Sequence, residues 1–263
     1  MKYPIDLLTE KLNHLDRVYD EFVVKWEIME VQIAVAKIGK YGTSDSGDTV
    51  EVVERPQGGV SLVLADGQSS GRGAKWISTL VVRKVISLLA EGVRDGAAAR
   101  AASDSLYTER GGRVSATLNI LSVDMQTRTL VITRNNPITA VIAHYDQIQF
   151  LNEDSRPVGL YRDTRPVITE VSLEPGLTAI VFSDGLTYAG DRDGTPLDLE
   201  ACLCSLLDNE DPSSNFLADS LLEHAIKLDQ GRPADDISIA VLRVVPSNGD
   251  DIRRMSVRLP LKP

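Results

Sequence analysis

Apolar residues recur along the chain with two different periods, and the changes between them predict the order of strands and helices. Alternating or continuous short apolar runs predict strands at 31–38, 49–54, 60–65, 114–123, 129–133, 138–144, 167–173, 177–183 and 237–245. Apolar spacings of three and four residues predict helices at 74–91, from 95 or 96 to about 107, at about 198–207 and at 214–228. Strands that are segregated from helix pairs favour an α+β sandwich, in which two antiparallel sheets lie face to face with helices outside.

Short turn sequences predict which strands pair. Residues 55–59 (Arg-Pro-Gln-Gly-Gly) predict a hairpin between 49–54 and 60–65. If this turn is centred on Gln57, Asp48 lies directly opposite Asp66, and the two carboxylates repel each other unless a cation sits between them. The turns at 124–128 and 135–137 predict an antiparallel meander through 114–144, and residues 174–176 predict that 167–173 pairs with 177–183.

The two ends of the chain are expected to lie outside the main domain, which we place at residues 29–246. An apolar stripe from Ile5 to Trp26 predicts an amphipathic helix within residues 1–28. Its heptad spacing fits a coiled-coil dimer, and it fits equally well a helix that packs on its own domain. Residues 247–263 form a basic tail whose alternation around Met255 to Leu259 fits an edge strand or an extended arm.

Composition narrows the range of partners. The formal net charge of −10 argues against nucleic acid, and no apolar run approaches the roughly 20 residues of a membrane span. The N-terminal residues lack the apolar core of a signal peptide, so a cytoplasmic protein is expected. Two cysteines, Cys202 and Cys204, are too few for a disulfide framework and fit small buried residues better than a metal site.

Carboxylates stand at one end of three apolar strands. Asp66-Gly67 follows residues 60–65, Asp184-Gly185 follows 179–183, and Asp235-Asp236 precedes the last strand. If the last strand runs antiparallel to the other two, these acids meet at one edge of the sandwich. Carboxylates near a core are costly unless they are paired or bind metal, and hard divalent cations prefer oxygen ligands. The sequence therefore predicts a Mg²⁺ or Mn²⁺ site in which Gly67 lets the backbone bend and its carbonyl reach the ion.

An ordered set of motifs resembles the metal-dependent protein phosphatase family (PPM, type 2C), and is most similar to its bacterial branch of sporulation stage II protein E and stress-response serine phosphatases. The set comprises Ser46-Gly47-Asp48, Val63-Leu64-Ala65-Asp66-Gly67-Gln68, Ser115-Ala116-Thr117-Leu118, Pro157-Val158-Gly159-Leu160, Val181-Phe182-Ser183-Asp184-Gly185 and Asp235-Asp236-Ile237-Ser238. Each motif alone is unspecific, but their order over residues 30–245 is specific.

The resemblance implies a four-layer α-β-β-α sandwich with two Mn²⁺ or Mg²⁺ ions. It implies that Asp66 bridges both ions, that the Gly67 carbonyl and Asp48 bind the second, and that Asp184 and Asp235 hold the first, with Asp236 binding or supporting. It also implies hydrolysis of a phosphoserine or phosphothreonine by a water that the two metals activate. The expected substrate is a phosphorylated regulatory protein of the STAS (anti-sigma-antagonist) type in stress or sporulation signalling.

Three points remain open at the level of sequence. The eukaryotic branch commonly has a histidine where this chain has Gln68, so the general acid differs. Residues 69–73 before the helix favour a helix-capping loop over a phosphate cradle, and Arg72 in that loop is a candidate for binding the phosphoprotein. The alternatives to a protein phosphatase are a catalytically silent binding module with the same fold and a metallohydrolase of small phosphate esters.

Overall fold

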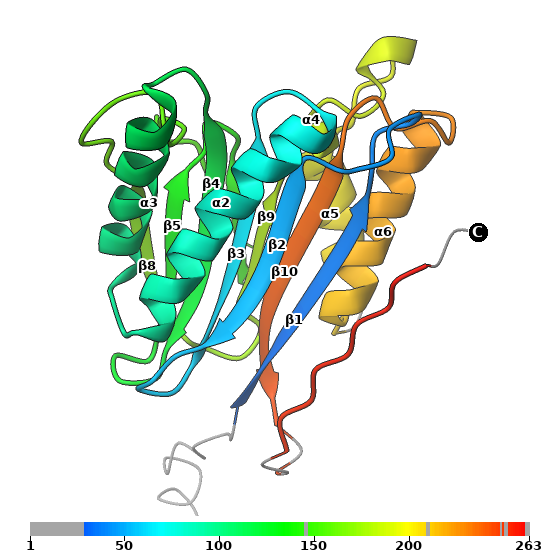
Figure 1. Cartoon of the computed structure of the whole chain (residues 1–263). Coiled ribbons are helices and arrows are strands. Elements are labelled where there is room, and N and C mark those ends of the chain that lie inside the picture. Colours follow the sequence, from blue (N-terminus) through cyan, green and yellow to red (C-terminus); the bar gives the residue numbers. More distant parts are fainter. Residues whose placement is uncertain (1–28, 145–146, 209–210, 248, 250–251, 261–263) are drawn as a thin grey trace, which may run out of the picture. The chain divides into compact units, whose positions relative to one another are not determined.

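The computed structural model describes residues 29–144, 147–208, 211–247, 249 and 252–260, and within them two five-stranded sheets lie face to face (Figure 1). The predicted helix in residues 1–28 falls outside the described residues. The first sheet has the order β1 (Met29–Ile38), β10 (Ile237–Pro246), β9 (Thr178–Phe182), β6 (Ala140–His144), β7 (Gln147–Leu151). The second has the order β2 (Asp48–Glu54), β3 (Val60–Gly67), β4 (Ala116–Asp124), β5 (Thr129–Asn135), β8 (Val167–Ser172).

Two helices cover the outer face of the second sheet. Helix α2 (Gly71–Ala90) and helix α3 (Asp95–Arg110) bury their apolar stripes against alternate residues of β3 and β4. Helix α3 ends where Gly111 adopts a left-handed conformation at φ 64°, as glycine commonly does after a helix. The buried members of this layer include Val81, Val85, Ala102, Leu106, Val63, Ala65, Leu118 and Ile120.

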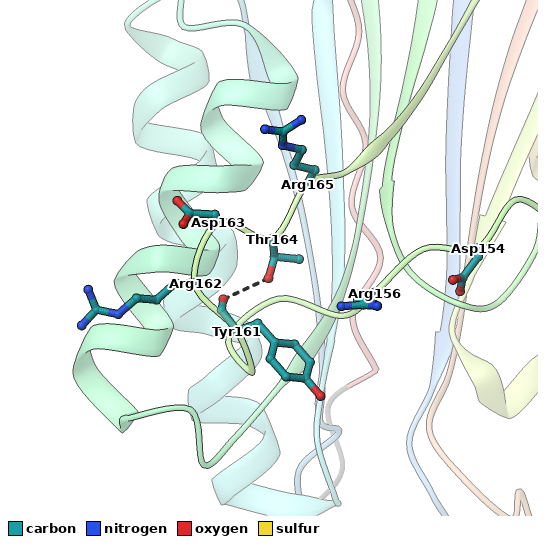
Figure 2. A pocket seen from close by; sticks show the side chains of 7 residues that line it. All are labelled: Asp154, Arg156, Tyr161, Arg162, Asp163, Thr164 and Arg165. Atoms are coloured by element: carbon teal, nitrogen blue, oxygen red, sulfur yellow. Dashed lines mark hydrogen bonds between the residues drawn. The ribbon is translucent and has the colours of Figure 1, made fainter.

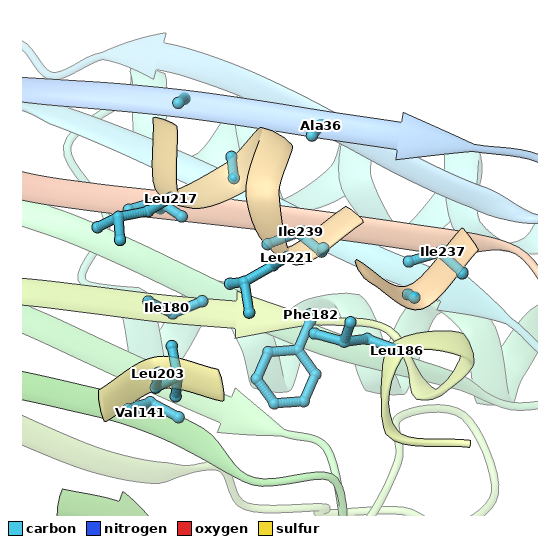
Figure 3. Packing of buried hydrophobic residues seen from close by; sticks show 14 of the residues in the cluster. Ala36, Val141, Ile180, Phe182, Leu186, Leu203, Leu217, Leu221, Ile237 and Ile239 are labelled. Carbon is cyan, nitrogen blue, oxygen red and sulfur yellow. The ribbon is translucent and has the colours of Figure 1, made fainter. Parts of the chain in front are cut away.

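A second helix pair covers the outer face of the first sheet, as Figure 3 shows. Leu203 of α5 (Leu199–Leu207) and Leu217 and Leu221 of α6 (Ser214–Leu228) pack with Ile180 and Ile239 of the central strands. The helix-facing residues alternate along each strand with residues that face the opposite sheet. In β3 the latter are Leu62 and Leu64, which are almost completely buried between the sheets. The predicted α-β-β-α sandwich is confirmed.

Two predicted strand pairings are wrong, because the chain changes sheets where a hairpin was expected. Strand β8 pairs with β5, whereas β9 pairs with β10 and β6, so residues 174–176 connect the two sheets. The burial patterns show the reason: β8 alternates between half-buried and exposed residues, as an edge strand does, whereas β9 is buried throughout, as a central strand is. The meander likewise stops at β5, because β6 belongs to the other sheet.

The crossing from β5 to β6 is held by a buried arginine. The guanidinium of Arg134 donates to the carbonyl oxygens of Asn136, Ile138 and Glu153 at 3.3–3.4 Å, and only 1% of this residue is exposed. Its bonds satisfy carbonyl groups at the point where the strand ladder ends. Strand β7 was not predicted, because its five residues give too short an alternation to stand out.

The remaining described residues add little regular structure. A short helix α4 (Asp184–Thr187) and a 3-10 turn η1 (Asp191–Asp193) follow β9. Residues 252–260 of the tail form neither helix nor strand and are exposed. Among the described helices, none is long and apolar enough to cross a membrane.

Candidate active site

A cleft of about 360 Å³ opens where the predicted carboxylates meet. Asp66, Asp184 and Asp235 all line it, although they lie far apart in the sequence. The other residues that line the cleft are mainly small or polar, namely Lys40, Gly67, Gln68, Ser69, Ser70, Ser115, Thr117, Pro157 and Asp236. The structure therefore brings together the acids from three separate segments that the sequence placed at strand ends.

Strand direction explains this convergence. Strand β9 runs antiparallel to β10, with Phe182 opposite Ile239, so the end of β9 and the start of β10 lie at the same edge. Asp184, two residues after β9, and Asp235, two residues before β10, are thereby neighbours. Asp66 reaches the cleft from the other sheet, as the penultimate residue of β3.

Asp48 lies directly opposite Asp66, as the centre of the turn at Gln57 predicted. It is completely buried, and neither of its carboxylate oxygens makes a well-formed hydrogen bond with a described residue. Burial raises the pKa of Asp48 to about 6, against the opposing effects of the nearby Ser238 and Ser183 hydroxyls. Burying a carboxylate without a well-formed hydrogen bond costs free energy, and a cation bound at this position would lower that cost.

Negative charge accumulates around Asp66. Burial, followed by the charges of Asp48 and Asp184, raises the pKa of Asp66 to about 9. Burial and then the charge of Asp235 raise the pKa of Asp184 as well. Across the described ranges, no three His, Cys, Asp or Glu side chains are already arranged as ligands of one ion. The carboxylates would have to turn toward a common cation, and such a cation would relieve their mutual repulsion.

Three lysines near the acids were missed by sequence reasoning. The ammonium groups of Lys37 and Lys75 both donate to the backbone carbonyl of Asp48, at 2.7 Å for Lys75, and Lys40 lies 3.8 Å from the Asp235 carboxylate. Burial lowers the pKa of Lys37 and of Lys75. Lysines are common on surface strands and helices, so no sequence signal distinguishes these three. They offset part of the negative charge, but neither they nor the other described residues give the Asp48 carboxylate a well-formed hydrogen bond.

Asp236 has a structural task. One of its carboxylate oxygens accepts the backbone N–H of Lys40 at 2.9 Å, and the other accepts that of Gly47 at 2.7 Å. These bonds fix the loop at 39–47 to the start of β10, next to Asp235. The geometry favours a supporting role for Asp236 over direct metal binding, which stays a prediction.

Asp229, at the end of α6, is a further positioning residue that sequence reasoning missed. It is buried, and its two oxygens accept the N–H groups of Gly190 and Ala234, both at 2.9 Å. The bond to Ala234 fixes the residue just before Asp235. An aspartate that follows a helix gives no sequence signal for such a role.

Close backbone packing explains the glycine after Asp66. A Cβ atom on Gly67 would lie 2.0 Å from the carbonyl oxygen of Ala74 in the first turn of α2. The same holds for Gly185, whose Cβ would lie 2.2 Å from the carbonyl of Asp236. Both glycines let separate segments approach the cleft more closely than any other residue would allow.

Gln68 and Arg72, the two residues near the start of α2 that the sequence singled out, lie in different places relative to the cleft. Gln68 lines the cleft, and its Oε1 accepts the backbone N–H of Ser115 at 3.0 Å. Arg72 does not line the cleft: its side chain is 89% exposed and lies 3.4 Å from Asp45. Ser70 occupies the helix-capping position without a side-chain capping bond. The position of Arg72 therefore gives no support to its predicted role in substrate binding.

Comparison with known proteins points to one family. The family model described as stage II sporulation protein E (SpoIIE) matches residues 56–245. Among curated proteins, none matches the sequence significantly. Among solved structures, the PP2C phosphatase domain of SpoIIE from Bacillus subtilis, with a fragment of its regulatory domain, superposes with a TM-score of 0.72 at 20% identity. That match covers 84% of this chain and 64% of the other, so this chain spans just under two thirds of that structure.

Two further structures share the fold. The catalytic domain of the serine/threonine protein phosphatase PstP, solved with two manganese ions, matches with a TM-score of 0.64 and 18% identity over 82% of this chain and 99% of that one. RsbX, solved with magnesium, matches with a TM-score of 0.62 and 16% identity over 81% and 95%. At such identities these likenesses establish the fold, whereas the family rests on the sequence match.

Proposed function

The chain belongs to the stage II sporulation protein E (SpoIIE) family, and we propose that it is a metal-dependent phosphatase of phosphoserine and phosphothreonine in proteins. The observation that carries this proposal is the meeting of Asp66, Asp184 and Asp235 on one cleft, next to a buried Asp48 whose carboxylate makes no well-formed hydrogen bond with the described residues. Such a group of acids is unfavourable by itself and becomes favourable around divalent cations.

The donor set fits Mn²⁺ or Mg²⁺. All of the candidate ligands are oxygens, and no described cysteine or histidine lines the cleft, which argues for a hard cation. Two ions, as in the PstP structure, would suit an acid cluster of this size. When bound, such a pair of ions would activate a water and neutralise a phosphate during in-line attack.

The residues at the cleft would have separate roles in binding the metal ions and in positioning the ligands. Asp66 stands between the two groups of acids, with Asp48 on its own sheet and Asp184 and Asp235 on the other, so it is suited to contact both ions. The Gly67 carbonyl offers a further oxygen at the same edge. Asp236 and Asp229 hold the backbone on either side of Asp235, and thereby orient the ligands without contacting the phosphate.

Release of the serine oxygen needs a proton, since its bond to phosphorus breaks with both electrons staying on oxygen. The side-chain amide of Gln68 is not acidic at neutral pH and cannot protonate the leaving oxygen, and its carbonyl oxygen accepts the backbone N–H of Ser115. Among the described histidines, neither His144 nor His224 lines the cleft. We infer that the proton comes from water in the open cleft.

A phosphorylated regulatory protein of the STAS type in the cytoplasm is the proposed substrate. This choice follows from the resemblance to the sporulation and stress-response branch, and membership of a family named for a sporulation protein agrees with it. The open cleft lets a phosphorylated side chain on a protein surface enter.

Turnover of a phosphopeptide tests the proposal. With Mn²⁺ present, wild type is expected to release phosphate, whereas Asp66→Asn and Asp184→Asn are expected to lose most of this activity. Asp219→Asn, an exposed aspartate of α6, serves as the matched control. Equal turnover by wild type and both cleft variants would reject the assignment.

A further inference from the structure

A second cavity, of about 280 Å³, lies on the loop between β7 and β8 (Figure 2). Its lining is dominated by charged side chains, with the aromatic ring of Tyr161 among them. Three are arginines, Arg156, Arg162 and Arg165, and two are aspartates, Asp154 and Asp163. Nothing in the mechanism above uses this surface.

Arg156, Arg162 and Arg165 are not paired with acidic side chains in the described part of the chain. In the described part of the chain, none of the three forms an ion pair within 4.0 Å, although Asp154 and Asp163 line the same cavity. Arg156 lies over the ring of Tyr161, at 5.6 Å from its centroid, and Arg162 lies over that of Tyr107, at 5.2 Å. With three arginines against two aspartates, the cavity lining has a formal charge of +1 in a protein whose net charge is −10, and among the described residues these arginines are free to pair with a partner's acids.

The loop that carries them is firmly anchored. The side-chain amide of Asn135, at the end of β5, donates to the carbonyls of both Arg156 and Arg165, at 3.0 and 3.3 Å. Val158 exchanges two backbone hydrogen bonds with Ala116 of β4, and Thr164 is buried and bonds to the carbonyl of Tyr161. A surface fixed in this way can bind a charged partner at a smaller entropic cost than a mobile loop.

The loop that carries the three arginines also adjoins the active-site cleft. Pro157 lines the cleft, and Arg156, the preceding residue, lines the second cavity. A chain whose phosphorylated residue enters the cleft would therefore bring its neighbouring residues to Arg156, at the edge of the cavity that Arg162 and Arg165 also line. One substrate could therefore contact both the active-site cleft and the second cavity.

We propose that Arg156, Arg162 and Arg165 form a docking surface for an acidic segment of the phosphoprotein substrate, next to its phosphorylated residue. The inference rests on the proposed phosphatase function and names a feature of its substrate. Figure 2 shows Arg162 and Arg165 pointing in different directions from the loop, which suits separate carboxylates along an extended peptide better than one phosphate. Arginine is well suited to this task, because its planar fork pairs with carboxylates.

Kinetics with two phosphopeptides test the proposal. Both carry the same phosphoserine, one flanked by glutamates and the other by glutamines, and p-nitrophenyl phosphate reports the chemistry of the cleft alone. The variant is Arg162→Glu/Arg165→Glu, whose residues do not line the cleft. Arg83→Glu, an exposed arginine of α2, is the control for a change of net charge.

In the double variant, KM for the glutamate peptide is expected to rise about tenfold. Two exposed contacts between arginine and glutamate are lost, and each is replaced by repulsion between two glutamates. Turnover of the glutamine peptide and of p-nitrophenyl phosphate should stay near wild type, and added salt should remove the preference of wild type for the glutamate peptide. An equal KM for both peptides in wild type, or an equal loss on both in the double variant, would overturn the docking surface.

A binding measurement separates failure of this inference from failure of the proposed function. Fluorescence anisotropy of a labelled, non-phosphorylated glutamate peptide needs no catalysis. Binding that the double variant weakens and Arg83→Glu does not would support the docking surface even if wild type hydrolysed none of the three substrates. Active wild-type enzyme that binds the glutamate and glutamine peptides equally would refute it. Arg162→Gln/Arg165→Gln replaces the glutamate variant if that one fails to turn over p-nitrophenyl phosphate.

Discussion

Replacing Asp66 by asparagine should make the metal-free protein more stable while it removes activity. The pKa of about 9 means that the folded protein binds a proton at Asp66 more tightly than the unfolded chain, whose carboxyl has the ordinary value of 3.8. Stability from this group is therefore complete below about pH 4 and is lost as the pH rises toward 9. Asparagine has the same shape and carries no charge, so it removes this loss.

The size of the effect follows from the proton balance. Between the ordinary pKa of 3.8 and pH 7, a span of about three pH units, the folded protein keeps the Asp66 proton while the unfolded chain releases it. At about 1.36 kcal/mol per unit, the free energy of unfolding falls by about 4 kcal/mol over this span. Asp66 is partly exposed in the open cleft, where water weakens the repulsion, so we expect a gain of about 2 kcal/mol for Asp66→Asn.

Urea unfolding at pH 7 in the presence of a chelator measures this gain, with Asp219→Asn as the control that should change nothing. Repeating the measurement with Mn²⁺ should reverse the order, since wild type gains the free energy of metal binding and the variant gains little. A less stable Asp66→Asn in chelator, or equal stabilisation of both proteins by Mn²⁺, would refute the reasoning.

Three further results are expected. In chelator, the unfolding free energy of wild type should fall between about pH 4 and pH 7, because burial and like charges raise the pKa of Asp48, Asp66 and Asp184; a flat urea profile would contradict this. Gly67→Ala should lower stability by about 2 kcal/mol or more and abolish turnover, since its Cβ would collide with the first turn of α2; wild-type melting and activity would disprove the close approach. Asp95→Ala should cost about 3 kcal/mol in urea unfolding, because it leaves the half-buried Arg55 guanidinium without its carboxylate partner at 3.2 Å; a change below the measurement error would show that this ion pair is not stabilising.

The sequence was sufficient to predict those features of the structure that depend on local patterns. The hairpin turn at Gln57 gave the register of Asp48 with Asp66, and the apolar stripes gave the four main helices. The sequence showed that Asp184 and Asp235 would meet if β9 and β10 ran antiparallel, and the structure has them antiparallel. These features depend on residues within one or two neighbouring elements.

The sequence was insufficient where the outcome depends on distant partners. Residues 174–176 have the composition of a hairpin turn, yet they connect two sheets, because burial on both faces draws β9 to a central position. Lys37 and Lys75 come from different elements and meet only at the Asp48 carbonyl. The bonds of Asp229 to Gly190 and Ala234 also join segments that no local pattern relates.

Anomalous scattering from crystals soaked in Mn²⁺ tests the central claim most directly, since it shows where the metal ions bind. The structure predicts two peaks in the cleft, within coordination distance of the carboxylates of Asp66, Asp184 and Asp235 and of the Gly67 carbonyl. A cleft without a peak at saturating Mn²⁺, or peaks only at other surface acids, would contradict the account.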